Sequence, residues 1–355
     1  MMVNIKISLI FCCYNVSKYL DMVYHLLNKQ PYRNIEVIFV EDCSTDDTKE
    51  KLFALVDDPR MTIIENNHNL GLSASRNVGL KHATGDYVGF PDPDDMFDVN
   101  WLVEVSKIIQ TYQPQVIVTG MREDYELNNK LQYSKEVLSE YSGFIHEKDD
   151  MLKAIVNLES VFLFGFANNK FYKTSLLKDK GLTYKQLALK EDFEFNIRLF
   201  YHVDNIYILN KPYYFYKKRN NNSLTNKFVK EYFTLHIDTL CDFKNFLENK
   251  YFLSKQAESL IVNRFFRYFL SAIERNHNVA SNLMPKEQLE WIRDILLNEK
   301  YTYFFENIDL LDGKLKYIRV LIKYKKVYYF YFLGKVINHI KNKFPILFSK
   351  IRGNR

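Results

Sequence analysis

The first 120 residues alternate between short apolar runs and amphipathic stretches, and this alternation limits the fold more than any other feature. IKISLIFC at 5–12 and IEVIFV at 35–40 have the length and composition of buried strands. The stretch between them, 18–28, carries apolar residues at helical spacing. Strands that alternate with helices through short connections form a parallel sheet covered by helices. We therefore predict an α/β domain with a mostly parallel sheet.

The same alternation continues towards the middle of the chain. We predict further strands at 61–65, 87–90, 116–119 and 205–209, and further helices at 48–56, 73–82, 100–112 and 193–200. The segments 149–158 and 170–178 are predicted to be structured, without a type being assigned. Ser44 is the expected N-cap of the helix at 48–56, with Asp47 completing a capping box. The stretch from Glu123 to Ser142 is polar and is predicted to be irregular.

Strand signals stop after about residue 226, and the chain then has a helical pattern as far as residue 305. With 355 residues, the chain is long enough for more than one compact unit. We predict a sheet domain at 1–226, a helical region at 227–313 and a basic amphipathic tail at 314–355.

The net charge of +6 is concentrated in that tail. Residues 314–355 contain twelve Lys and Arg and no Asp or Glu, so the rest of the chain holds 37 basic and 43 acidic residues. Within 316–344, apolar side chains recur at helical spacing between lysines. A basic amphipathic helix of this kind suits an anionic membrane surface. A helix that packs on the protein or joins copies of the chain into a homo-oligomer explains the same pattern equally well.

Cysteine usage and hydropathy indicate the cytoplasm. Cys12, Cys13, Cys43 and Cys241 include no CxxC pair, so neither a disulfide framework nor a zinc site is expected. The first residues lack the pattern of a signal peptide, and no apolar run is long enough to span a bilayer. We expect a cytoplasmic protein that is peripheral at the inner face of the plasma membrane.

Polar side chains follow three successive predicted strands at the point where each strand ends. Tyr14 follows the first strand, Glu41 and Asp42 close the second, and the acidic cluster FPDPDD at 90–95 follows the fourth. Carboxyl ends of parallel strands share one edge of the sheet, which is where such sheets bind ligands. Clustered carboxylates suit Mg²⁺ or Mn²⁺, which prefer oxygen ligands. Taken singly, each group also fits a solvated loop or an acidic approach to a helix.

Arg76 lies between Gly71 and Gly79, near the start of the helix predicted at 73–82. A helix N-terminus with an arginine beside it can bind an anion such as a phosphate. An ordinary surface arginine on an amphipathic helix is the alternative.

Several segments, in order, resemble glycosyltransferase family 2, whose members have the GT-A fold. They are SLIFCCYNVSKYL, IEVIFVEDCSTDDT, NHNLGLSASRNVGL and GDYVGFPDPDD, followed by NKFYKTSLL, ALKEDFEFNIRLF and KPYYFYKKRNNNSLT. The resemblance covers roughly residues 5 to 226. Each segment is short, but the ordered set is specific.

The resemblance implies a set of donor-binding residues. Tyr14 corresponds to an aromatic that stacks on the base, and Asp42 to the carboxylate that recognises uracil. Arg76 corresponds to an arginine near the nucleotide or its phosphates. Lys217 and Arg219, on either side of a further lysine, stand where family members often contact the diphosphate.

The resemblance also implies the metal site and the base. Asp92 and Asp94 correspond to the DxD pair, with Asp94 or Asp95 closest to a Mn²⁺ or Mg²⁺ ion. Asp192 corresponds to the catalytic base and is preceded by Glu191 as a secondary site residue. The alternative for Asp192 is an acidic residue that complements a helix dipole.

The activity implied is inverting transfer of a sugar from a nucleotide-sugar, with a UDP-sugar expected, to a hydroxyl of a growing bacterial surface glycan or a lipid-linked acceptor. The helical region would then contact the acceptor or other copies of the chain. No Gln-x-x-Arg-Trp motif is present, so transfer of one sugar or a short chain is expected. Cys43 stands where glycine is frequent in the family, so the turn after the second strand is expected to differ in shape.

Three other classes remain as alternatives. A nucleotidyltransferase would need a phosphate-binding loop rich in glycine, and the chain has only eleven glycines. A nucleic-acid-binding module would use the basic tail but would leave the strand-end carboxylates unexplained, so no nucleic acid partner is expected. A catalytically inactive, membrane-associated scaffold would not need the intact carboxylates.

Overall fold

The computed structural model describes residues 5–55, 57–127, 130–219 and 228–344. The chain divides into two compact units, 1–226 and 227–355. Each unit is described by itself.

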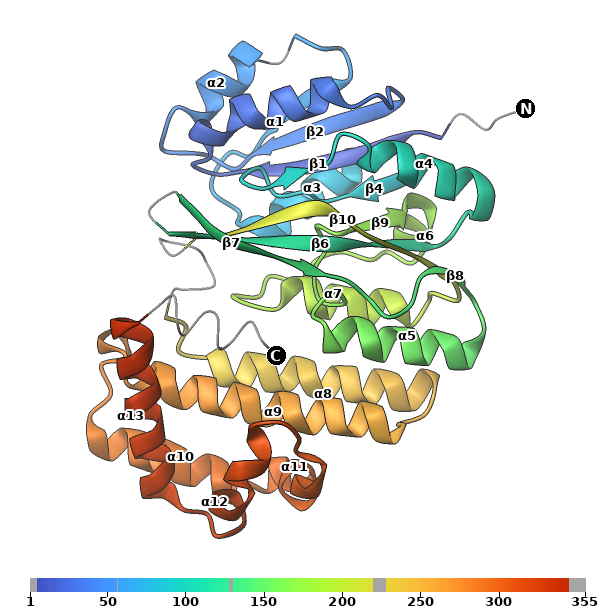
Figure 1. Cartoon of the computed structure of the whole chain (residues 1–355). Helices are drawn as coiled ribbons and strands as arrows, with labels where there is room; N and C mark the ends of the chain where they lie inside the picture. The colour runs from blue at the N-terminus through green and yellow to red at the C-terminus, as the bar shows by residue number, and fades with distance from the viewer. Residues whose placement is uncertain (1–4, 56, 128–129, 220–227, 345–355) are drawn as a thin grey trace. The chain divides into compact units, whose positions relative to one another are not determined.

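The first unit is built on one sheet with helices on both faces (Figure 1). Its main path runs in the order β3-β2-β1-β4-β9-β6-β10-β5, with β7 beside β6 and β8 beside β10. The strands are β1 (Ile7–Cys13), β2 (Ile35–Glu41), β3 (Met61–Glu65), β4 (Tyr87–Gly89), β5 (Met96–Phe97), β6 (Val116–Leu127), β7 (Lys130–Val137), β8 (Gly143–Ile145), β9 (Lys170–Lys173) and β10 (Ile206–Arg219).

Four neighbouring strands, β3, β2, β1 and β4, are parallel. β1 and β2 are the apolar runs predicted from the sequence, and Phe11 stacks on Phe39 across their register. Buried strands of this kind read as continuous apolar runs because both faces of the sheet are covered. Their parallel order brings the ends of β1, β2 and β4 to one edge.

The helices of the first unit connect these strands. They are α1 (Ser17–Lys29), α2 (Thr48–Leu55), α3 (Leu72–His82), α4 (Trp101–Tyr112), α5 (Lys148–Ser160), α6 (Thr174–Asp179) and α7 (Glu191–Phe200). α3 packs against β1 and β2, and α1 packs against α2. The sequence predicted α1, α2, α3, α4 and α7 to within a few residues, whereas α5 and α6 lie in stretches predicted only as structured.

The second half of the sheet differs from the expectation. β9 is antiparallel to both β4 and β6, and β5, β7 and β8 are also antiparallel to their neighbours. The sheet is therefore mixed rather than mostly parallel. The polar stretch from Glu123 to Ser142 is not irregular, because β6 continues to Leu127 and pairs with β7. β10 is also longer than predicted, since it pairs with β6 along its whole length.

The second unit is helical throughout its described residues. Its longer helices are α8 (Tyr232–Lys250), α9 (Lys255–Asn276), α10 (Pro285–Leu297) and α13 (Val327–Lys343), joined through α11 (Thr302–Glu306) and α12 (Arg319–Lys323). Its core is aromatic: Phe233, Phe265 and Phe269 are buried and pack edge to face or stacked with their neighbours. No helix in the described ranges is apolar over a length that would cross a bilayer.

The segment predicted as one amphipathic tail helix is broken. α12 ends at Lys323 and α13 begins at Val327, with Lys325 between them in the left-handed region at φ 47°. α13 packs on α9 and α10, so the described part of the tail belongs to the helical unit. Residues 345–355 of the predicted tail lie outside the described residues.

Candidate active site

The predicted strand-end residues lie at the carboxyl edge of the parallel strands. Tyr14 follows β1 and is 45% exposed, as an aromatic platform must be. Asp42 follows β2 and is buried. Burial raises the pKa of the Cys12 thiol to about 12, and Arg76, Asp92 and Asp42 all act on it electrostatically. These charges therefore lie near the carboxyl end of β1.

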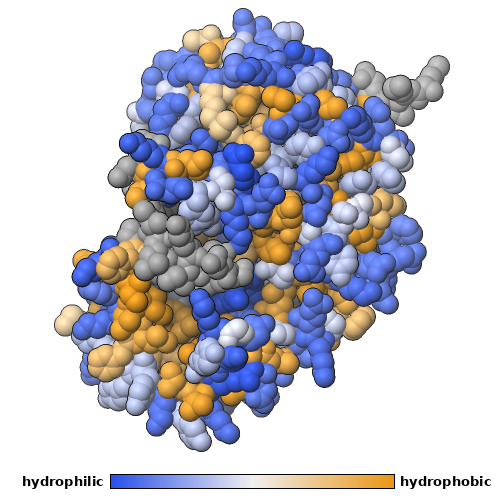
Figure 2. Space-filling view, viewed as in Figure 1, coloured by the Kyte–Doolittle hydropathy of each residue, from blue (hydrophilic) through white to orange (hydrophobic). Residues whose placement is uncertain are grey.

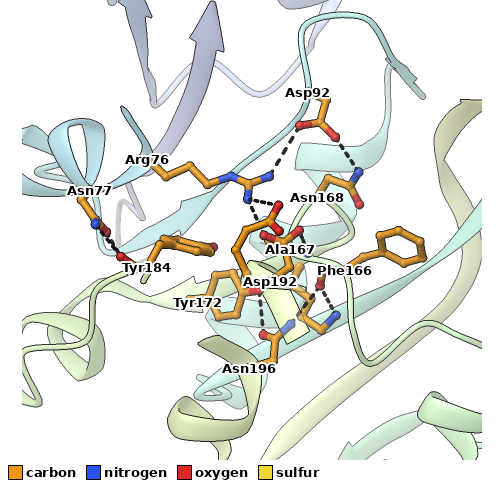
Figure 3. A network of polar contacts seen from close by, with 12 residues as sticks. Arg76, Asn77, Asp92, Phe166, Ala167, Asn168, Tyr172, Tyr184, Asp192 and Asn196 are labelled. Atoms are coloured by element: carbon orange, nitrogen blue, oxygen red, sulfur yellow. Dashed lines mark hydrogen bonds and ion pairs between the residues drawn. The ribbon is translucent and has the colours of Figure 1, made fainter. Parts of the chain in front are cut away.

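Arg76 is the centre of a buried cluster of charge (Figure 3). Its side chain is only 3% exposed, so it is not the surface arginine that was the alternative. The guanidinium pairs with Asp192 through Nη1, lies 3.7 Å from Asp92 Oδ1 and 3.8 Å from Glu191 Oε1, and sits over the ring of Tyr184. Three carboxylates from two separate segments thus share one cation.

The loop between α5 and β9 connects the two sides of this cluster. Asn168 donates from Nδ2 to Asp92 Oδ2 at 2.9 Å, and the backbone N–H of Ala167 donates to Asp192 Oδ2 at 3.2 Å. Consecutive residues of one loop therefore hold the two carboxylates in Figure 3. A shift of this loop would move both groups together.

Lys170 and Asn196 hold that loop in place through hydrogen bonds to its backbone carbonyls. Lys170 is fully buried and its Nζ donates to the carbonyls of Leu163 and Phe166 and to Asn169 Oδ1. Burial lowers the pKa of Lys170 to about 7, against the opposing effect of Asp192. Asn196 donates to the carbonyl of Phe166 and accepts from the hydroxyl of Tyr172.

Glu191 and Asp192 open α7 after Lys190, which adopts φ 70°. Burial, reinforced by the neighbouring Asp192, raises the pKa of Glu191 to about 7. Burial also raises the pKa of Asp92 to about 6, although Arg76 opposes this. Both shifts are expected where carboxylates outnumber the cations beside them.

The three aspartates of the acidic turn have different environments. Asp95 is buried: it accepts from the hydroxyl of Tyr214 and from the backbone N–H of Lys217, both at 2.8 Å. Its carboxylate therefore fastens the turn to β10. Asp94 is 40% exposed and pairs with the guanidinium of Arg219. Asp94 is the more accessible of the two residues predicted to bind metal.

The three basic side chains at the end of β10 have different partners. Arg219 reaches Asp94 and also lies over the ring of Tyr19. Lys217 Nζ lies 3.5 Å from Glu126, and Lys218 Nζ lies 2.6 Å from Glu123. Of the predicted diphosphate contacts, Arg219 pairs with the acidic turn through its side chain, whereas Lys217 contacts Asp95 through its backbone N–H.

The carboxylates of Asp42 and Glu41 also accept hydrogen bonds from backbone N–H groups. Asp42 accepts from the N–H groups of Leu70 and Gly71 and from Asn66 Nδ2, all between 2.8 and 2.9 Å. It thereby fixes the approach to α3, which carries Arg76. Glu41 accepts from the backbone N–H of Ser44 at 2.7 Å.

Ser44 is not the N-cap that was predicted. α2 begins only at Thr48, whose N–H donates to Asp46 Oδ1, and Ser44 Oγ accepts from the N–H of Asn15 instead. Cys43 adopts φ 57°, the left-handed conformation that glycine takes most easily.

The described residues contain no group of three or more His, Cys, Asp or Glu side chains arranged to hold a metal ion. Mg²⁺ and Mn²⁺ are commonly held by one or two carboxylates together with substrate phosphates. Asp94 fits this mode, because its carboxylate is accessible and already faces a cation, Arg219. Asp95 fits less well, since both of its oxygens accept protein hydrogen bonds.

A surface hollow of about 420 Å³ lies elsewhere, beside Ile5, Asp86 and Lys178. These residues are at the amino ends of β1 and β4, whereas ligands of such sheets bind at the carboxyl ends. We therefore assign the site to the charge cluster and not to the hollow.

Sequence reasoning missed the residues that hold the cluster together. Lys170 and Tyr214 lie in segments that were noted for their resemblance to the family, and Tyr214 lies beyond the strand predicted at 205–209. Nothing in the local pattern around Asn168 or Lys170 indicated a buried polar side chain.

Comparison with known proteins shows which proteins the chain is similar to. Residues 8–178 match the family described as Glycosyl transferase family 2. Glycosyltransferase GlyA of Streptococcus pneumoniae is 28% identical over 253 residues, which are 70% of this chain and 36% of that protein. Poly(ribitol-phosphate) beta-N-acetylglucosaminyltransferase TarS of Staphylococcus aureus is 27% identical over 229 residues, 63% of this chain and 38% of that protein. The chain thus matches little more than a third of the length of either relative.

EpsJ of Bacillus subtilis, an uncharacterized glycosyltransferase, matches over most of both chains, with 24% identity across 82% of this chain and 83% of that protein. Among solved structures, residues 1–349 of TarS in complex with UDP-GlcNAc superpose with a TM-score of 0.67 and 20% identity. That match covers 93% of this chain and 90% of the TarS chain. The fold is therefore the GT-A fold followed by a helical region.

Proposed function

Because the chain belongs to glycosyl transferase family 2, we propose that it transfers one sugar from a UDP-sugar to a hydroxyl group with inversion at the anomeric carbon. The acceptor is a growing bacterial surface glycan or a lipid-linked precursor of one. The structure of TarS contains UDP-GlcNAc, which supports a nucleotide-sugar donor of this type.

The observation that carries the proposal is the cluster of Asp92, Asp192 and Arg76 at the carboxyl edge of the sheet. In the proposed reaction, the acceptor hydroxyl gives its proton to Asp192 as its oxygen attacks the anomeric carbon. The bond between that carbon and the diphosphate oxygen breaks, and UDP leaves with the electron pair. A positioned general base contributes about 10²- to 10⁴-fold to such a step.

Arg76 and Ala167 position the base in this proposal. The ion pair and the 3.2 Å hydrogen bond from the Ala167 N–H restrict the carboxylate of Asp192 to one orientation. Asn168 joins the same loop to Asp92, so the donor side and the base side keep a constant separation. Holding reacting groups in place reduces the entropy that the reaction must lose.

The leaving diphosphate needs positive charge near the acidic turn. A bound Mn²⁺ or Mg²⁺ would supply it, held by Asp94 with Asp95 or Asp92 close by. The guanidinium of Arg219, which pairs with Asp94, would supply a further positive charge beside the diphosphate. Tyr14 is exposed at the end of β1 and suits stacking on the base.

We further propose that the protein works in the cytoplasm, peripheral to the inner face of the plasma membrane. Lipid-linked acceptors are held at that surface. The basic residues after 314, without acidic neighbours, support this location.

The test is donor hydrolysis and transfer with a panel of UDP-, GDP-, dTDP- and CMP-sugars, in Mn²⁺ and in EDTA. We expect turnover of one UDP-sugar, loss of turnover in EDTA, and a large loss in Asp94→Ala. The anomeric configuration of the product, read by NMR, checks inversion. Absence of turnover together with absence of UDP binding by calorimetry would favour the inactive scaffold.

A further inference from the structure

One side of α13 is fixed on the helical unit. Phe330 is fully buried, and a Cβ on Gly334 would lie only 2.3 Å from Ile273, so the two helices approach closely there. Lys341 Nζ lies 3.0 Å from Glu274 Oε2. The rotation of α13 about its own axis is therefore set by these contacts.

That rotation leaves an apolar stripe on the outside. Tyr328, Phe332 and Val336 follow one another at intervals of four residues, and their exposed fractions are 63%, 60% and 53%. Residues four apart share one face of a helix. Tyr317, Val320 and Tyr324, which lie before, in and directly after α12, are between 62% and 75% exposed. We call these six residues the tail face; Figure 2 shows orange side chains where α13 lies in Figure 1.

Exposed lysines surround the tail face, and acidic residues are missing from it. Lys316, Lys323, Lys326 and Lys335 are all exposed. The sequence from 314 to 344 has no Asp or Glu. Large apolar side chains on the surface of a protein mark a contact site when they are grouped. The partner of this one must accept both apolar contact and positive charge.

A second copy of the chain fits these requirements poorly. A two-fold contact would place each copy's tail face against the same face of its partner, and the lysines would repel one another. An anionic bilayer fits better: tyrosines favour the headgroup level, lysines bury their stems while the ammonium groups reach lipid phosphates, and apolar side chains enter the acyl boundary.

We propose that the tail face docks on an anionic lipid surface. Phe332 and Val336 enter the boundary between headgroups and acyl chains, and the lysines around them bind the lipid phosphates. This inference deepens the location given under the proposed function, but it does not depend on sugar transfer, because no donor takes part in it.

The test is flotation of the full chain with vesicles of phosphatidylcholine, with and without phosphatidylglycerol. The face variant replaces Tyr328, Phe332 and Val336 by serine. The control variant replaces Phe252, Met284 and Leu297 by serine; these are 54%, 66% and 56% exposed in the same unit but lie off the tail face. A charge variant replaces Lys323, Lys326 and Lys335 by glutamate.

We expect the wild type to bind anionic vesicles at least tenfold more tightly than neutral ones. The face variant should lose tenfold or more, the control less than twofold, and the charge variant roughly fivefold for each lysine. A wild type that does not float, or a control that loses as much as the face variant, overturns the proposal. So does a dimer in analytical ultracentrifugation that only the face variant abolishes, or binding to polyuridine without binding to vesicles.

Discussion

The two units of the chain both bury charged side chains, but in different arrangements. In the helical unit, Glu274 is buried on α9 and is paired by Lys341 and Asn338 of α13. One negative charge meets one positive charge, and the pair joins two helices. In the sheet unit, Arg76 faces Asp92, Glu191 and Asp192 at once.

The difference lies in the balance of charge. A balanced pair needs nothing further, whereas three carboxylates around one guanidinium leave an excess of negative charge that a proton or a bound cation must offset. The raised pKa values of Asp92 and Glu191 are the consequence of that excess together with burial. Buried charge alone does not indicate an active site; an unbalanced cluster of charge at the carboxyl edge of a sheet is the reason for our proposal that the site lies there.

The largest effect should come from the base. We expect Asp192→Asn to lower kcat by about 10²- to 10⁴-fold, because the acceptor proton then has no carboxylate to receive it. Glu191→Gln is the matched control and should cost about tenfold or less. The measurement is steady-state transfer at saturating donor. If the losses were reversed, Glu191 would be the base.

The next prediction tests the excess of negative charge around Arg76. Arg76→Met leaves the three carboxylates without a counter-charge and should destabilise the fold by about 3–5 kcal/mol. The deficit should be larger at pH 8 than at pH 5, because carboxylates whose folded pKa is raised lose stability as the pH rises through it. Urea unfolding at both pH values measures this.

Arg60→Met is the control for Arg76. Arg60 forms a half-buried pair with Asp58, two residues before it in the sequence, in which one guanidinium meets one carboxylate, and its removal should cost about 1 kcal/mol. A pH-independent deficit in Arg76→Met would mean that the carboxylates are not coupled to it.

A third variant addresses the helical unit. Gly334→Ala places a Cβ 2.3 Å from Ile273 and 3.0 Å from the ring of His277, and overpacking of this kind costs about 1–3 kcal/mol. Val336→Ala on the exposed side of α13 should change stability by about 0.5 kcal/mol or less. Thermal unfolding compares the two. UDP affinity should be the same in both, and a loss in Gly334→Ala alone would contradict the assignment of donor binding to the sheet unit.

The last prediction concerns Lys170, where the effect at any one pH is expected to be small near neutrality. Its folded pKa of about 7 lies below its ordinary value of 10.5, so the folded state holds fewer protons than the unfolded state between them. Stability from this group is present above the ordinary value and is lost as the pH falls towards 7. As the pH rises through that window, the free energy of unfolding of the wild type should increase by up to about 1.4 kcal/mol per pH unit relative to that of Lys170→Met. If the free energy of unfolding changed with pH in the same way for the wild type and for Lys170→Met, then Lys170 would carry the same charge in the folded and unfolded states.

Much of the first half of the fold could be predicted from local pattern. β1, β2 and β4 are short apolar runs with helices between them, and the ends of such strands meet at one edge, so Tyr14, Asp42 and the acidic turn could be placed together before any contact was known. Arg76 was a candidate because it lies near a predicted helix start, but its role and that of Asp192 were identified through family resemblance.

The rest depended on contacts distant in sequence. The hairpin of β6 and β7 was missed because its residues are polar and exposed, and pairing between strands, not burial, holds it. Ser44 has the chemistry of an N-cap, but its hydroxyl is bonded by the N–H of Asn15, 29 residues away in the sequence.

The sequence alone determined the α/β class, the carboxyl edge at which we propose the active site and the basic character of the chain after 314, because strand burial, residue type and charge are local properties. Only the tertiary structure decided that Arg76 is buried against Asp192, that Asp95 turns inward while Asp94 stays accessible, and which side of α13 is exposed. Each of these depends on which segments meet in space, and a residue's charge has a different effect when it meets a carboxylate, a backbone N–H or water.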